Sequence, residues 1–166
     1  GDHGITIMSC REELSFRADL KSDAAPLNHL IAEVLEAAPH TRCFRDPTRG
    51  GLASTLNELA EQSGVDMVVD EMNVPVKDAV RGACEMLGYD VFQVANEGKM
   101  VCVVPAEESE LALKAMRSNA YGADAAIIGE VLPCPDDRSP RVSIRTGFGS
   151  MRILDMLVGE QLPRIC

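Results

Sequence analysis

The sequence predicts an α/β domain of the α+β kind, in which helices pack against a mixed β-sheet. Two observations predict this fold class. Segments with the i, i+3, i+4, i+7 spacing of amphipathic helices alternate with short apolar runs typical of strands. The chain has 166 residues, which is enough for one domain with its own core, and neither an internal repeat nor a linker divides it.

Apolar spacing and end residues predict the helices. Asp23 is expected to cap the first helix and Pro39 to end it. The second is expected to begin at Gly50-Gly51 and to end at Gly64, because glycine tolerates the left-handed backbone at a helix C-terminus. The predicted helices cover residues 27–38, 52–60, 76–87 and 111–116.

Short apolar segments rich in β-branched residues predict the strands. Residues 100–104 and 127–128 are continuously apolar, which is typical of strands covered on both faces. Residues 5–13 fit a strand or a helix equally well, and residues 133–140 form a loop rich in Pro and Asp. The predicted strands cover residues 65–69, 100–104, 125–131, 142–145 and 151–154.

The two ends of the chain differ from an ordinary domain. The first residue is Gly rather than Met, which indicates a piece of a longer chain, and no export signal is visible. Residues 156–166 are expected to form a mobile tail on a domain of residues 1–155. Chain termini are mobile unless they are tied down, and Pro163 prevents a helix through this segment.

Charge and cysteine usage exclude several classes of protein. The net charge of −10 gives an acidic surface, which repels nucleic acids and anionic membranes. No apolar run is long enough to span a membrane. The six cysteines form no Cys-x-x-Cys pair, so we expect no metal site and reduced thiols in a cytoplasmic protein.

One candidate binding motif precedes the second predicted helix, at residues 45–51 with the sequence RDPTRGG. The free N–H groups and the dipole of a helix N-terminus attract an anion, and Gly50 and Gly51 would let a ligand approach the backbone. Thr48 offers a hydroxyl donor and Arg49 a forked donor for phosphate oxygens. The alternative is a structural loop with a solvated arginine, and the residues alone favour neither.

A second candidate lies at residues 95–99, with the sequence ANEGK. Glu97 at the entry to a strand can project into a cleft and act as a base or a metal ligand. The residues alone favour a simpler alternative, a turn in which Asn96 and Gly98 adopt unusual backbone angles.

The third candidate is the terminal cysteine, Cys166, where packing gives no reason for a thiol. A thiol on a moving tail could carry an acyl-type group, since the thiolate is the nucleophilic form of cysteine. His3 could be a ligand, but hydrogen bonds to its neighbours are the commoner case, and Asp23 is explained by helix capping. His29 and His40 are predicted to be surface residues without a role.

Four motifs taken together resemble the HypE family of hydrogenase maturation factors, within the aminoimidazole ribonucleotide synthetase superfamily. The resemblance spans the whole chain but only the C-terminal half of that family's protein, and it implies a three-layer α/β domain. The motifs are Gly1-Asp2-His3-Gly4, the 45–53 sequence RDPTRGGLA, Ala95-Asn96-Glu97-Gly98 and terminal Pro163-Arg164-Ile165-Cys166.

The resemblance implies a chemistry. In that family a partner, HypF, transfers a carbamoyl group to the terminal thiol, which matches Cys166. ATP, with Mg²⁺, then activates the carbonyl oxygen, and dehydration leaves a thiocyanate. The cyano group passes to iron on a HypC–HypD complex as a cyanide ligand of [NiFe] hydrogenase. Glu97 matches the active-site glutamate, and the loop of Thr48, Arg49, Gly50 and Gly51 is placed to hold phosphate.

The resemblance also sets limits and leaves alternatives. The N-terminal half of that family, which carries most nucleotide and magnesium ligands and the contact of a homodimer, is absent here, so this chain alone is expected to be inactive. Another ATP-dependent superfamily member, such as a selenophosphate synthetase-like or thiamine phosphate kinase-like protein, would not need Cys166. A non-catalytic module that presents a thiol would not need Glu97. We also expect Gly51→Asp to weaken nucleotide use with the fold intact.

Overall fold

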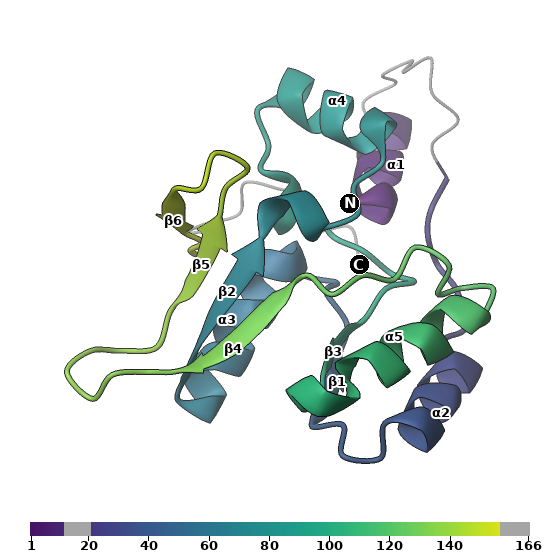
Figure 1. The fold of residues 1–166 in the computed structure, drawn as a ribbon. Helices are drawn as coiled ribbons and strands as arrows, with labels where there is room; N and C mark the ends of the chain where they lie inside the picture. Colours follow the sequence, from purple (N-terminus) through teal and green to yellow (C-terminus); the bar gives the residue numbers. More distant parts are fainter. Residues whose placement is uncertain (12–20, 157–166) are drawn as a thin grey trace.

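The structure, a computed structural model, describes residues 1–11 and 21–156. Figure 1 shows helices on more than one side of the strands. The helices are α1 (Asp2–Arg11), α2 (Asn28–Ala37), α3 (Gly51–Ser63), α4 (Asp78–Leu87) and α5 (Ser109–Ser118). The strands are β1 (Cys43–Arg45), β2 (Val65–Asp70), β3 (Val101–Val103), β4 (Gly129–Pro133), β5 (Val142–Arg145) and β6 (Met151–Ile153). Short 3-10 turns, η1 (Glu71–Asn73), η2 (Val91–Gln93) and η3 (Ala106–Glu108), connect them.

The larger sheet is mixed. Its four strands run in the order β4-β2-β5-β6, and the β2–β5 pair is parallel while the two outer pairs are antiparallel. Side chains of β2 and β5 on one face, including Met67, Val69 and Ile144, pack against α3 through Leu56 and Ala60. This cluster is the largest apolar core of the described residues, and it packs α3 against one face of the sheet.

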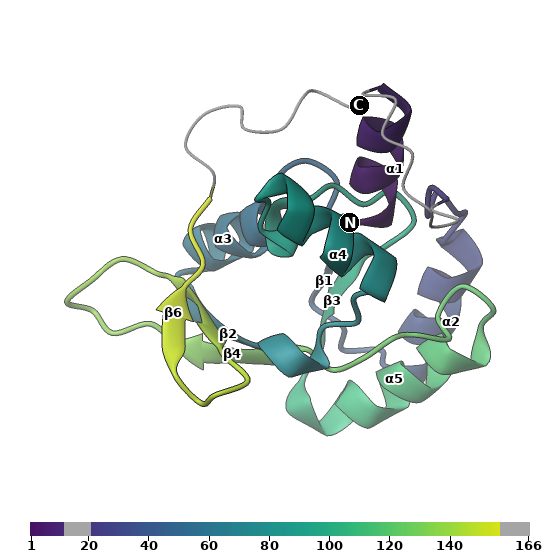
Figure 2. The same ribbon diagram turned by 90° about the horizontal axis from the view of Figure 1, so that it is seen from above.

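A second, smaller sheet pairs β1 with β3 in antiparallel register, Phe44 opposite Cys102. The helices α2 and α5 pack together over it through Leu30, Val34 and Ala112. On the other side of the molecule α1 packs against α4, as the view from above shows (Figure 2). The prediction of a domain with helices packed on a mixed sheet is confirmed; the division of the strands into two sheets was not predicted.

All four predicted helices form, with small shifts at their ends. Gly64 and Gly88 end α3 and α4 in the left-handed conformation, at φ of 65° and 71°. The ambiguous residues 5–13 belong in part to α1. The prediction that Asp23 caps the first helix is wrong: α2 begins at Asn28 and has no side-chain cap. Asp23 instead bonds to Lys99 and to the backbone N–H of Glu97.

The strand predictions need two corrections. The strand expected at 125–131 begins only at Gly129, because pairing with β2 starts where Asp70 N donates to Ile128 O, at 2.8 Å. The apolar runs are not fully covered on both faces: β3 is half-buried along its length, and Ile127 is exposed. The strand β1 was missed because three residues are too few for a pattern.

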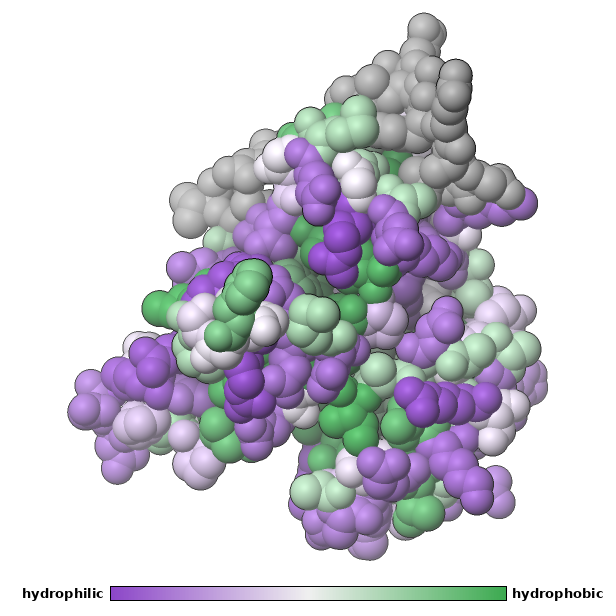
Figure 3. Space-filling model, turned by 45° about the horizontal axis from the view of Figure 1, so that its top comes forward, coloured by the Kyte–Doolittle hydropathy of each residue, from purple (hydrophilic) through white to green (hydrophobic). Residues whose placement is uncertain are grey.

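On the surface, hydrophilic side chains separate the hydrophobic ones, as Figure 3 shows for one face. The exposed large hydrophobic residues include Phe148, Met151 and Ile153 on the β5–β6 hairpin. Within the described ranges, no helix has both the length and the apolar character needed to cross a bilayer.

Candidate functional site

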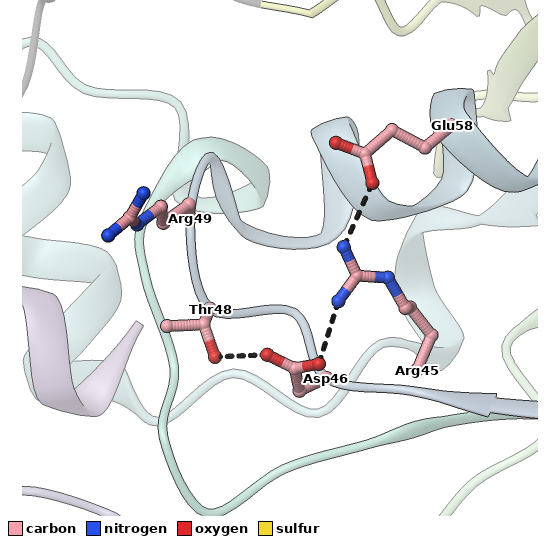
Figure 4. A pocket seen from close by; sticks show the side chains of 5 residues that line it. All are labelled: Arg45, Asp46, Thr48, Arg49 and Glu58. Atoms are coloured by element: carbon pink, nitrogen blue, oxygen red, sulfur yellow. Dashed lines mark hydrogen bonds and ion pairs between the residues drawn. The ribbon is translucent and has the colours of Figure 1, made fainter. Parts of the chain in front are cut away.

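The segment between β1 and α3 forms a pocket of about 230 Å³ (Figure 4). The guanidinium of Arg45 donates to Asp46 Oδ1 at 2.8 Å and to Glu58 Oε2 at 3.0 Å. Thr48 Oγ1 donates to Asp46 Oδ2 at 2.7 Å, and this hydrogen bond lowers the pKa of Asp46. Arg45 is thus engaged by carboxylates of its own chain. Arg49 is exposed, and Figure 4 shows it turned away from that network, where it can meet an anion.

The structure explains why glycine occupies both positions at the start of α3. Gly50 and Gly51 adopt left-handed φ values of 66° and 60°. A Cβ atom on Gly51 would lie 2.6 Å from both Phe92 O and Val94 O. The close approach that Gly51 permits is therefore to the protein's own backbone, whereas a Cβ on Gly50 would meet the side chain of Ser54. The expectation that Gly51→Asp leaves the fold intact is contradicted, because no side chain fits at this position.

The same packing brings the two central motifs together. Asn96 N and Asn96 Nδ2 both donate to Pro47 O, at 3.2 Å and 3.3 Å. Asn96 is buried, and its amide also donates to Val94 O at 3.1 Å. Glu97 and the Thr48 loop therefore lie on two adjoining segments, a juxtaposition that sequence spacing alone does not show.

Glu97 lies at the edge of a polar cluster. Its side chain is 30% exposed, its N–H donates to Asp23 Oδ1 at 3.3 Å, and its Oε1 lies 3.9 Å from His3 Nε2. Gly98 has no left-handed φ, so the alternative of a turn that needs unusual angles there is not supported. The glycine is required by crowding instead: a Cβ on Gly98 would lie 1.6 Å from Asp23 O.

Two lysines neutralise the carboxylates of this cluster. Lys99 Nζ donates to Asp2 Oδ2 at 2.7 Å and to Asp23 Oδ2 at 2.5 Å, and Lys77 Nζ lies 2.8 Å from Asp2 Oδ1. Burial raises the pKa of Asp2 and of Asp23, but the hydrogen bonds and charges of the lysines outweigh it and lower both pKa values. The cluster joins α1 and the segment before α2 to the segment that carries Glu97.

The sequence analysis did not predict the polar cluster around Glu97. Asp2 and His3 were assigned no role and Asp23 only a cap, yet all three lie within the cluster. His29 and His40 are exposed, as predicted, and His40 pairs with Glu108. A signal for the cluster was present, since Lys99 follows Glu97 by two residues and offers a cation to nearby acids.

The sequence predicted no metal ligands in this chain and a tail that ends in Cys166. In the described ranges no group of three or more His, Cys, Asp or Glu side chains is arranged to hold a metal ion. Cys166 and the predicted tail, apart from Met156, lie outside the described residues.

The similarity to known proteins is extensive. Residues 1–139 match the family described as AIR synthase related protein, C-terminal domain. The chain belongs to this family. It is 54% identical over 166 residues to the carbamoyl dehydratase HypE of Azotobacter vinelandii, which covers all of this chain and 48% of that protein. The chain thus spans about half the length of the curated relatives it matches.

Solved structures give the same result. The crystal structure of a hydrogenase maturation protein HypE in complex with ATP superposes with a TM-score of 0.93 at 46% identity, over 100% of this chain and 50% of that chain. A HypE–HypF complex superposes with a TM-score of 0.88 at 45% identity, over 95% of this chain and 50% of that one. The similarity therefore concerns the complete described fold.

Proposed function

We propose that this chain forms the C-terminal part of a carbamoyl dehydratase that uses ATP to convert a carbamoyl group on Cys166 into a thiocyanate. The juxtaposition of Glu97 with the Thr48 loop, through the Asn96–Pro47 hydrogen bonds, is the observation that carries the proposal. It puts a carboxylate next to a loop with phosphate-binding donors. The 54% identity to a carbamoyl dehydratase supports the same activity.

The chemistry assigns a task to each residue. The S-carbamoyl group on Cys166 attacks the γ-phosphorus of ATP through its carbonyl oxygen; ADP leaves and one N–H proton is released. The C–O bond of the phosphorylated intermediate then breaks, phosphate departs, and loss of the second N–H proton completes the C≡N bond. Glu97 accepts a proton in this sequence, since a positioned carboxylate is a general base. Arg49 and the backbone amides of Gly50 and Gly51, at the start of α3, bind phosphate oxygens, and the Thr48 hydroxyl joins them when it exchanges its hydrogen bond to Asp46 for one to phosphate.

Division of the chain into a domain of residues 1–155 and a carrier tail of residues 156–166 belongs to the same proposal. A terminal thiol must reach both a carbamoyl donor and the Thr48 loop. Termini that are not tied down have that reach. The tail therefore supplies the substrate group and the domain supplies the proton acceptor and part of the phosphate site.

The partners in the proposal follow from the similarity. One structure with 45% identity is a HypE–HypF complex, which supports a HypF-like carbamoyltransferase as donor. The HypE–ATP complex supports ATP as the second substrate. Transfer of the cyano group to iron on a HypC–HypD complex, Mg²⁺ as the metal that accompanies ATP, homodimerisation of the full-length protein and a cytoplasmic location complete the proposal.

The alternatives have less support. A small-molecule kinase of the superfamily would not need a terminal cysteine, and the 54% identical relative is a carbamoyl dehydratase. A docking module that only presents a thiol would leave the Glu97 carboxylate without a chemical task. The position of the Glu97 carboxylate beside His3 favours the catalytic alternative over this one.

A Glu97→Gln variant tests the proposal. The full-length protein that contains this sequence is first carbamoylated with the HypF-like partner and carbamoyl phosphate. It is then mixed with ATP, and the intact mass of the protein is followed over time. We expect carbamoylation to persist and dehydration to slow by about 10²–10⁴-fold, because glutamine retains size but not basicity. Glu107→Gln, on η3 and away from the site, is the matched control. Dehydration by Glu97→Gln at the wild-type rate would overturn the role of Glu97.

A further inference from the structure

We propose that His3 is a positioning residue that orients the Glu97 carboxylate, and that Ser22 fixes the ring of His3 for this purpose. The inference rests on the proposed function of Glu97 and deepens it. Its geometric basis is a chain of three side chains: Ser22 Oγ lies 2.9 Å from His3 Nδ1, and His3 Nε2 lies 3.9 Å from Glu97 Oε1.

The contact between Ser22 and His3 is compatible with a tautomer of His3 that suits this role. Ser22 Oγ accepts a hydrogen bond from Ala24 N at 3.2 Å and lies 2.9 Å from His3 Nδ1, where a hydroxyl can donate or accept; in the proposed arrangement it donates to Nδ1. A neutral imidazole that accepts at Nδ1 carries its hydrogen on Nε2. That hydrogen faces Glu97 Oε1, which is an acceptor in the carboxylate form. His3 is thereby a donor toward Glu97 and not a competing base.

The backbone around His3 is attached to the segment of Glu97 on both sides. Asp2, the preceding residue, is held by Lys99 Nζ, two residues beyond Glu97. Gly4, the following residue, donates its N–H to Ala95 O at 3.1 Å, two residues before Glu97. A Cβ atom on Gly4 would lie 2.5 Å from Val94 Cγ1, so α1 approaches this segment as closely as a glycine permits.

Burial and distance fit an orienting contact. The side chain of His3 is 14% exposed and that of Glu97 is 30% exposed, so solvent competes little for the ring and more for the carboxylate. The 3.9 Å separation is longer than a hydrogen bond. Catalytic hydrogen bonds are often long in free enzymes and tighten when the substrate is bound. We therefore place the full contact in the complex with the carbamoylated tail and ATP.

Two isosteric substitutions separate orientation from packing. His3→Gln places an amide N–H2 near the position of Nε2 and retains a donor toward Glu97. His3→Asn places its amide near Nδ1, which retains a partner for Ser22 but leaves nothing that reaches Glu97. These two variants and His3→Ala are made in the full-length protein and carbamoylated on Cys166. Their dehydration with ATP is then measured under single-turnover conditions.

We expect His3→Ala and His3→Asn to slow dehydration by about 10-fold, the effect of losing one hydrogen bond to a charged group, with the KM for ATP and carbamoylation unchanged. His3→Gln recovers most of the rate. In a double variant, His3→Ala adds no loss to Glu97→Gln, because His3 acts through Glu97. His40→Ala is the matched control, since His40, which follows α2, also pairs with a glutamate, Glu108 of η3.

Three results would overturn the inference: His3→Gln as slow as His3→Asn, losses that multiply in the double variant, or a wild-type rate for His3→Ala. The first two would mean that His3 serves only packing, and thermal unfolding of each variant would show the matching loss of stability. A normal rate for Glu97→Gln contradicts the proposed function itself. A slow Glu97→Gln together with a normal His3→Ala contradicts only the role of His3.

Discussion

Asn96 and Pro47 are joined by two hydrogen bonds to one carbonyl oxygen, from the backbone N–H at 3.2 Å and from Nδ2 at 3.3 Å. A carbonyl oxygen has two lone pairs and can accept both. Glu97 and Thr48 are the next residues along the two segments. This contact therefore sets the spacing between the proposed proton acceptor and the proposed phosphate loop.

Asn96→Ala tests this contact. The variant loses the side-chain bonds to Pro47 O and Val94 O in a buried site, so we expect the free energy of unfolding to fall by about 1–3 kcal/mol in urea titrations. Dehydration by the full-length protein is expected to slow as well. Asn57→Ala is the control, because Asn57 Nδ2 also donates to two carbonyl oxygens, Ala53 O and Leu154 O. Equal losses of activity in the two variants would contradict a spacing role for Asn96.

The glycines Gly82, Gly88 and Gly51 differ in how much room the structure leaves for the Cβ atom that an alanine would add. Gly82→Ala is expected to raise the free energy of unfolding by about 0.5–1 kcal/mol, since Gly82 is inside α4 with no atom within 4 Å of the new Cβ. Gly88→Ala costs about 1–2 kcal/mol, because only its left-handed φ is strained. Gly51→Ala costs more than Gly88→Ala, because overlap with Phe92 O and Val94 O adds to the strain. A Gly51 variant as stable as the Gly88 variant would refute this packing.

Lys99→Met probes the polar cluster through its pH dependence. The pKa values of Asp2 and Asp23 are lowered in the folded state, so their contribution to stability is present above the unfolded pKa, near 3.8, and is lost as the pH falls through the lower folded values. We expect Lys99→Met to be less stable than the wild type by about 1 kcal/mol at pH 7, a modest value because Lys99 is 39% exposed.

The difference between Lys99→Met and the wild type should shrink below pH 3.8, where the carboxylates become protonated. Urea unfolding at pH 7, 5 and 3 measures it. Lys114→Met, on the exposed side of α5, serves as control and should change stability little at any of these values. A difference that stays constant across the range would show that Lys99 contributes through packing rather than charge.

Carbamoylation is expected at Cys166 and at no other thiol. Burial raises the pKa of Cys84, and it raises the pKa of Cys102 to about 11, which keeps both as unreactive thiols. Cys10 is the exposed thiol among the described cysteines and therefore the competitor to test. Peptide mapping after transfer, in the wild type and in Cys10→Ser, should locate the group on the terminal peptide in both. Loss of the label in Cys10→Ser, with Cys166 intact, would reassign the carrier.

The helices with strong apolar periodicity and the motifs at 45–51 and 95–98 could be predicted before the fold was known. Periodicity and C-terminal glycines are local signals, so α3, ending at Gly64, and α4, ending at Gly88, were predictable. The chemistry attached to the motifs came from their resemblance to a family, because a Gly-Gly pair or a lone Glu is not specific.

The residues that surround Glu97, in contrast, could not be predicted without the folded chain. Asp23 was predicted to be a helix cap because it precedes a predicted helix. Its carboxylate instead accepts a hydrogen bond from Lys99, 76 positions away in the chain. His3 reaches Glu97 because α1 packs against residues 94–97, and no local pattern records such a contact. Long-range pairing leaves no periodic trace in a sequence, so the partners of a functional residue become visible only when the chain is folded.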